Sequence, residues 1–134
     1  MTELAAGPAC GVALFVTLAG GRVPRRCPAA RPRVVALRWV WLGLNAAIEE
    51  LVWRGVALGL LALAVGPVAA LVVSTVAFAA WHAPALGRGA AVHLLTGAGF
   101  GAAYLVGGLG AAVFAHATYN VLVDWGVQAE RSAA

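Results

Sequence analysis

The sequence predicts an all-α fold, a polytopic transmembrane helix bundle of about five spans, from its composition and the placement of its charges. Of its 134 residues, 63% are hydrophobic and 10% are charged, against roughly 45–50% and about 25% in soluble domains. Residues 55–81 and 89–123 contain no Asp, Glu, Lys or Arg over 27 and 35 residues. Because about 20 apolar residues cross a bilayer, these two stretches have room for several spanning helices.

Composition also divides the chain into four parts. Residues 1–21 form a first apolar span, 22–38 an Arg- and Pro-rich cytoplasmic linker, 39–127 the core, and 128–134 a C-terminal tail. Gly66-Pro67, Gly87 to Gly89 and Gly107-Gly108 interrupt the apolar sequence and predict breaks between helices. The five expected spans are residues 4–21, 39–65, 68–86, 90–106 and 109–127.

Basic residues are concentrated in the linker, where six of the nine fall between Arg22 and Arg38. The tendency of positive loops to stay inside places this linker in the cytoplasm, beside anionic lipid headgroups. We therefore expect membrane lipid as a partner and a multi-pass location in the plasma membrane. Nucleic acid is not expected, because no aromatic residues are interleaved with the basic run.

Two adjacent acids lie in the middle of the second expected span. Each charge at mid-bilayer costs about 2.5–3.5 kcal/mol, yet Glu49 and Glu50 are two of only five acidic residues in the chain. Arg54 follows Glu50 by one helical turn, so the two charges can offset each other. Glu49 lies about 100° around the helix from Glu50 and lacks that partner. Such residues are candidates for a functional site.

Polar side chains on two other expected spans complete the candidate site. His82 follows Phe78 by four residues and Asn120 follows His116 by four, so each pair shares a helical face. Packing of the three helices would direct these polar groups and Glu49 into one cavity, with the active site toward the cytoplasmic half. A desolvated carboxylate suits general-base catalysis near neutral pH. Imidazole can share the water, and Asn or His can donate to a developing oxyanion.

Two other interpretations of these residues stay open at this point. Single polar residues in membrane helices often form hydrogen bonds that only hold helices together. The whole set, spread over three helices, is harder to explain in that way. Alternatively, His82, His116 and Glu49 could hold a zinc ion with one open coordination position.

Three motifs resemble those of a known family. Residues 49–55, Glu-Glu-Leu-Val-Trp-Arg-Gly, resemble its EExxxR motif, residues 78–82 resemble FxxxH, and residues 116–120 resemble HxxxN. The motifs occur in the same order in the CAAX-protease and bacteriocin-processing family of intramembrane peptidases, also called CPBP or Abi. The resemblance covers about residues 39–125, roughly two thirds of the chain.

The resemblance implies an enzyme, an intramembrane endopeptidase acting on a membrane-anchored, prenylated CAAX-like or bacteriocin-type substrate. It implies that Glu49 activates a water molecule with the help of His82, and that His116 and Asn120 stabilise the oxyanion. The second acid of EExxxR, Glu50, would hold the shape of the site together with its arginine. This glutamate mechanism needs no cofactor, although some descriptions of the family call its members metalloproteases, which keeps zinc open.

Two further functions can be set against this one. A non-catalytic membrane interaction or immunity protein could retain the protease fold. A haem- or proton-carrying protein could use His82, His93 or His116, but it would give no role to the paired glutamates. His93 otherwise reads as an ordinary histidine at a helix interface. Cys10 and Cys27 are expected to be unpaired.

Overall fold

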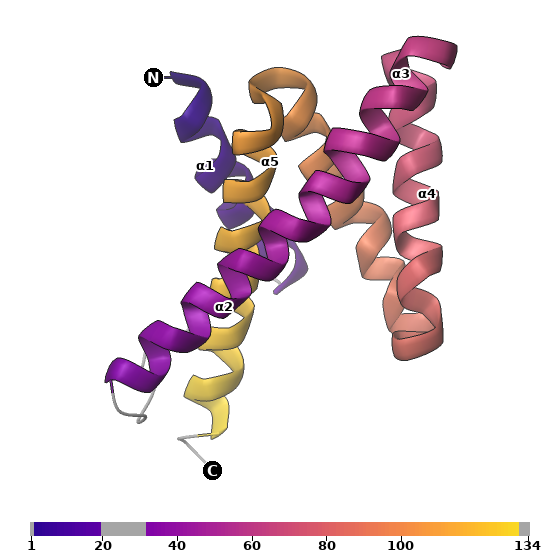
Figure 1. The fold of residues 1–134 in the computed structure, drawn as a ribbon. Coiled ribbons are helices and arrows are strands. Elements are labelled where there is room, and N and C mark those ends of the chain that lie inside the picture. The colour runs from indigo at the N-terminus through magenta and orange to yellow at the C-terminus, as the bar shows by residue number, and fades with distance from the viewer. Residues whose placement is uncertain (1, 20–31, 132–134) are drawn as a thin grey trace.

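The computed structural model describes residues 2–19 and 32–131, with side chains from residue 6 onward, and this part is helical apart from short turns (Figure 1). It contains no strand, so the all-α prediction is confirmed for the described residues. The elements are α1 (Thr2–Leu18), α2 (Pro32–Glu50), the π-helical η1 (Leu51–Leu58), α3 (Gly59–Val65), α4 (Pro67–Leu86), the 3₁₀-helical η2 (Gly87–Ala91) and α5 (Val92–Arg131).

The α2, η1 and α3 segments form one continuous rod that crosses the face of the molecule diagonally (Figure 1). The sequence continues as a helix through residues 32–65 because no Gly-Pro break occurs before Gly66. The π-helical segment begins directly after Glu50 and contains Arg54. Such π segments inside helices are frequently found at functional sites.

Glycines with positive φ stand at the three predicted breaks. Gly66, Gly87 and Gly108 have φ values of 82°, 54° and 71°, a region that other L-residues rarely adopt. At Gly108 the chain reverses, so α5 consists of two arms that meet at this turn and diverge from it (Figure 1). The helical segments between these breaks correspond to the last four segments expected from the sequence.

The second arm of α5 packs against α1. A methyl group at Gly7 or Gly11 would collide with the backbone carbonyl oxygens of Ala111 or Ala115, so these glycines let the two helix backbones come close. A buried cluster that includes Leu14 and Phe100 continues this contact toward the first arm of α5. The core is therefore built around α5, with the α2 rod and α4 packed on it.

Several expected boundaries need correction. The rod begins at Pro32, seven residues before the predicted Trp39, because proline is well accepted in the first turn of a helix. The segment expected as a loop after Leu86 is a short 3₁₀ helix, Gly87–Ala91. The last helix continues past Val127 to Arg131. Residues 20–31, which include Cys27 and most of the predicted linker, lie outside the described part.

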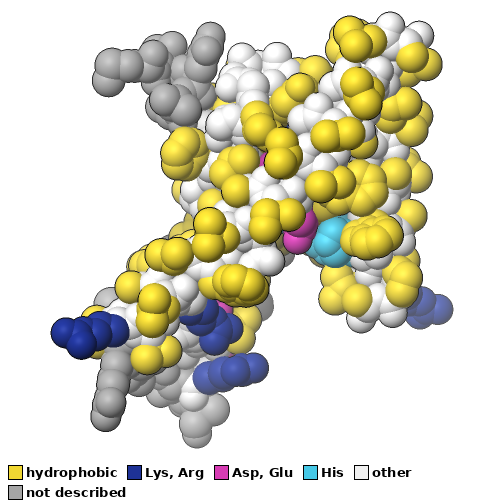
Figure 2. Space-filling model, viewed as in Figure 1, with side chains coloured by type: hydrophobic (Ala, Val, Ile, Leu, Met, Phe, Trp, Pro, Cys, Tyr) yellow, Lys and Arg dark blue, Asp and Glu magenta, His cyan; other side chains and the backbone are white. Residues whose placement is uncertain are grey.

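The outer surface is unusually apolar. Large hydrophobic side chains such as Leu37, Leu63, Val68, Trp81 and Val106 are exposed, as expected where lipid rather than water covers a protein. Within the described residues, one continuous run of helical residues is long and apolar enough to cross a membrane. This run is Pro67–Arg131, and it includes the turns at Gly87 and Gly108. Figure 2 shows a broad hydrophobic surface, with Arg side chains at its lower edge, near the start of α2, the end of α5 and η2.

Candidate active site

Glu50, Arg54 and His116 form a buried ionic cluster between the α2 rod and α5. The exposed fractions of these residues are 0%, 1% and 5%. Arg54 Nη1 donates to Glu50 Oε1 at 3.0 Å, and His116 Nδ1 lies 2.7 Å from the same oxygen. The predicted Glu50–Arg54 pair is therefore confirmed. The predicted packing placed Glu49 in one cavity with His116, whereas in the structure His116 contacts Glu50.

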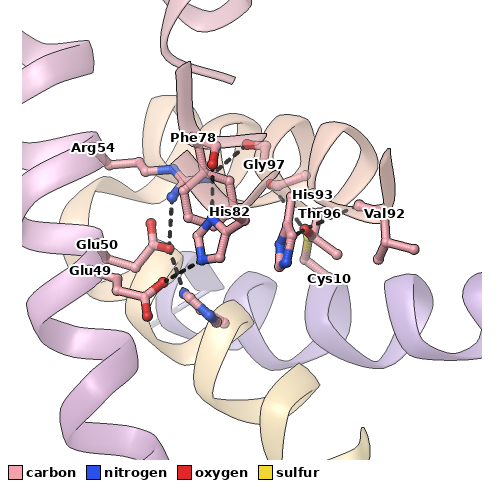
Figure 3. A network of polar contacts seen from close by, with 12 residues as sticks. Cys10, Glu49, Glu50, Arg54, Phe78, His82, Val92, His93, Thr96 and Gly97 are labelled. Atoms are coloured by element: carbon pink, nitrogen blue, oxygen red, sulfur yellow. Dashed lines mark hydrogen bonds and ion pairs between the residues drawn. The ribbon is translucent and has the colours of Figure 1, made fainter. Parts of the chain in front are cut away.

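Aromatic rings and one backbone carbonyl enclose this cluster. The Arg54 guanidinium lies 4.5 Å from the ring centre of Phe78 and 5.6 Å from that of Phe100. Arg54 Nη2 also donates to the Gly97 carbonyl at 3.0 Å (Figure 3). The His116 ring stacks on Phe100 with centroids 4.5 Å apart. Cation–π contacts and charge-assisted hydrogen bonds together compensate for burying the arginine.

A second pair, Glu49 and His82, lies beside the buried cluster and is partly exposed. The Glu49 side chain is 38% exposed, the His82 side chain is 21% exposed, and Glu49 Oε2 lies 3.9 Å from His82 Nε2. His82 Nδ1 lies 2.8 Å from the Phe78 carbonyl oxygen one turn earlier on α4. Figure 3 shows Glu49 and Glu50 projecting from the same helix toward different partners.

The partners of the two histidines indicate that each ring carries a proton on Nδ1. A carbonyl oxygen only accepts hydrogen bonds, so His82 carries its proton on Nδ1. Glu50 Oε1, which accepts from Arg54, is also the acceptor for His116, so His116 likewise donates from Nδ1. Both imidazoles consequently leave Nε2 for other partners. On His82 this nitrogen faces Glu49.

The structure brings most of the predicted residues together, but in two groups rather than one. Glu49 lies near His82, as the sequence analysis expected, whereas His116 contacts Glu50. Asn120 lies half-buried on α5 one turn after His116, and it forms no hydrogen bond with either group within the described part of the chain. The reason for the division is the 100° rotation between adjacent residues, which turns the two acids toward different helices.

His93, predicted only as an ordinary histidine at a helix interface, lies against the second group. Its ring stacks on His82, with centroids 4.1 Å apart and planes 26° from parallel. It also meets the Phe78 ring edge to face at 5.3 Å. A signal for this was available in the sequence, because His82 and His93 lie at nearly equal distances from the Gly87 to Gly89 break. Residues so placed meet across an antiparallel helix pair.

The zinc alternative does not fit the side chains as they are placed. Within the described residues no group of three His, Cys, Asp or Glu side chains is positioned to hold a metal ion. The expected ligands Glu49, His82 and His116 belong to the two separate groups. Cys10 is a free thiol whose sulfur lies 3.6 Å from the Gly99 carbonyl oxygen.

Comparison with protein families identifies the chain. Residues 31–122 match the family described as type II CAAX prenyl endopeptidase Rce1-like. The chain belongs to this family. The match contains all three motifs and every residue of both groups described above. It confirms the resemblance to CAAX-type intramembrane proteases, and it identifies the Rce1-like chain as a member of a membrane-embedded protease family. No curated protein and no solved structure matches the chain.

A bulky side chain at Gly97 is expected to destabilise this Rce1-like chain. A Cβ there would lie 3.1 Å from Phe78 Cδ1 and 3.6 Å from Arg54 Nη2. Gly97→Val should destabilise the protein by about 1–3 kcal/mol through overpacking, seen as a lower melting temperature in detergent. Gly43→Val is the matched control, because nothing lies within 4 Å of a Cβ at Gly43. Equal melting temperatures for the two variants would contradict the packing described here.

Proposed function

We propose that the chain is an intramembrane endopeptidase in which a water molecule between Glu49 and His82 attacks the peptide carbonyl of a membrane-anchored substrate. Family membership supports the reaction class. The observation that carries the mechanism is the 3.9 Å separation between Glu49 Oε2 and His82 Nε2. This distance is too long for a direct hydrogen bond and leaves room for a bridging water.

The two side chains suit a water molecule that acts as nucleophile. The Glu49 carboxylate and the bare Nε2 of His82 both accept hydrogen bonds, so the water donates one hydrogen to each. Its lone pairs then face away from both groups, toward a substrate carbonyl. Glu49 takes a proton as the oxygen attacks the carbonyl carbon, which is general-base catalysis.

The remaining steps need a donor to the oxyanion and a proton for the leaving amine. Asn120 can donate from its carboxamide, and His116 can donate from Nε2 when it is protonated, a charge that the neighbouring Glu50 stabilises. When the carbon–nitrogen bond breaks, the proton held by Glu49 passes to the amine nitrogen. The products are a carboxylic acid and an amine, and Glu49 returns to its ionised state.

The proposed substrate is a peptide held at the membrane by a lipid, of the prenylated CAAX type or the bacteriocin type. The described arginines outside the buried cluster are Arg33 and Arg38 on α2, Arg88 on η2 and Arg131 at the end of α5. We propose that the end of the molecule that carries these arginines faces the cytoplasm. We also propose that the helices cross the plasma membrane about five times. His82, one turn before the end of α4, then lies in the cytoplasmic half.

The experiment is cleavage of a peptide panel by the purified protein in detergent, with and without a chelator. The panel contains C-terminal CAAX peptides with and without an S-prenyl group, and mass spectrometry locates the cut. We expect cleavage of lipidated peptides that continues when the chelator is present. Absence of cleavage for every peptide would favour the non-catalytic interaction protein, and loss of activity with chelator, restored by zinc, would overturn the metal-free mechanism.

A further inference from the structure

Within its own helix, α4, the His82 ring is held by contacts with Phe78. Its Nδ1 lies 2.8 Å from the Phe78 carbonyl, and its ring meets the Phe78 ring at a centroid distance of 4.6 Å. Since the side chain is 21% exposed, these contacts alone leave it room to tilt. A small tilt moves Nε2 away from Glu49, and displacements of about 1 Å can cost about 100-fold in rate.

His93 covers a face of that ring from the neighbouring helix. The two imidazoles are stacked, with centroids 4.1 Å apart. Of the two, His93 is on α5 and His82 on α4, so the contact also fixes the His82 ring relative to the first arm of α5. No family motif identified in the sequence includes His93.

His93 is itself held in place. Its Nδ1 lies 3.5 Å from Thr96 Oγ1, and the Thr96 hydroxyl donates to the Val92 carbonyl at 3.3 Å. The hydroxyl oxygen therefore has a lone pair for the Nδ1 proton of His93. Thr96 is 1% exposed, so the anchor lies inside the protein. Contact with the Phe78 ring at 5.3 Å fixes the other side of His93.

We propose that His93 is a positioning residue for the reaction, whose flat ring keeps His82 Nε2 directed at Glu49. The proposal rests on the proposed function, because it concerns the same water site. It requires the planar shape of the side chain and not its ability to bind or release a proton. Phenylalanine at position 93 should therefore fulfil the same role as His93, whereas a flexible polar side chain should not.

The test is steady-state cleavage of an S-prenylated CAAX peptide by His93→Phe, His93→Ala and His93→Gln. We expect His93→Ala and His93→Gln to lower kcat about tenfold with KM nearly unchanged, and His93→Phe to restore most of the lost rate. Leu94→Ala is the control, since Leu94 is on the same helical turn and 45% exposed. Melting temperatures in detergent separate the loss of rate from loss of folded protein.

Three results would overturn the proposal. The first is a His93→Phe variant as slow as His93→Ala, which would mean that a ring nitrogen acts on the substrate. The second is a His93→Ala variant with the kcat of wild type. The third is an effect of the substitution on KM and not on kcat. The proposed function is tested separately by Glu49→Gln. Wild-type cleavage by this variant would contradict the proposed water site itself. If Glu49→Gln loses activity while His93→Ala cleaves like wild type, only the role proposed for His93 is contradicted.

Discussion

Replacing Glu49 by glutamine is expected to lower kcat about 10²–10⁴-fold and to leave the folded protein intact. Glutamine has nearly the same shape but cannot take a proton from the attacking water. The fold should not suffer, because the Glu49 side chain is 38% exposed and its nearest ionic partner is 3.9 Å away. The measurement is peptide cleavage by purified protein, together with its melting temperature in detergent.

The control for this substitution is Glu130→Gln near the end of α5, where the side chain is exposed. It removes the same charge from the chain without touching either group of the site, and wild-type cleavage is expected. If Glu49→Gln also cleaves like wild type, Glu49 is not the base. Loss of folded protein in Glu49→Gln would show that the acid supports the fold instead.

Replacing Arg54 by alanine is expected to have the largest effect on stability, about 3–5 kcal/mol. The substitution leaves the Glu50 carboxylate, which is 0% exposed, without its strongest partner. It also removes the hydrogen bond to the Gly97 carbonyl and the contact with the Phe78 ring. Thermal unfolding in detergent and the amount of protein in the membrane measure the effect.

A second variant separates the buried charge from the lost packing. Adding Glu50→Gln to Arg54→Ala removes the unpaired carboxylate, so the double variant should be more stable than Arg54→Ala alone. Arg88→Ala, at an exposed arginine, should melt like wild type. A melting temperature of Arg54→Ala equal to that of wild type would contradict the account of the cluster.

Much of the fold could be predicted because glycine and proline mark the helix ends. Gly66, Gly87 and Gly108 need positive φ, and sequence alone places the breaks at the same positions. The start at Pro32 was missed because a proline-containing, Arg-rich segment resembles a linker as much as a first helical turn. The π-helical segment at Leu51–Leu58 could not be predicted, since it follows from packing rather than from a local sequence signal.

Less of the site could be predicted, because adjacent acids give no sign of which helix each one faces. The spacing of Glu50 and Arg54 was enough to pair them within one helix. The contact between Glu50 and His116 spans 66 residues and depends on how the α2 rod is rotated against α5. His93 could have been found from its position across the Gly87 break from His82, a relation between helices rather than a motif.

The most direct test of the central claim is a double-mutant cycle between Glu49 and His82, measured as kcat for peptide cleavage. If the two side chains hold one water, the variant Glu49→Gln with His82→Ala loses little more rate than the slower single variant, because either change removes the same nucleophile. Losses that multiply in the double variant would show that the two residues act independently, and would contradict the shared water.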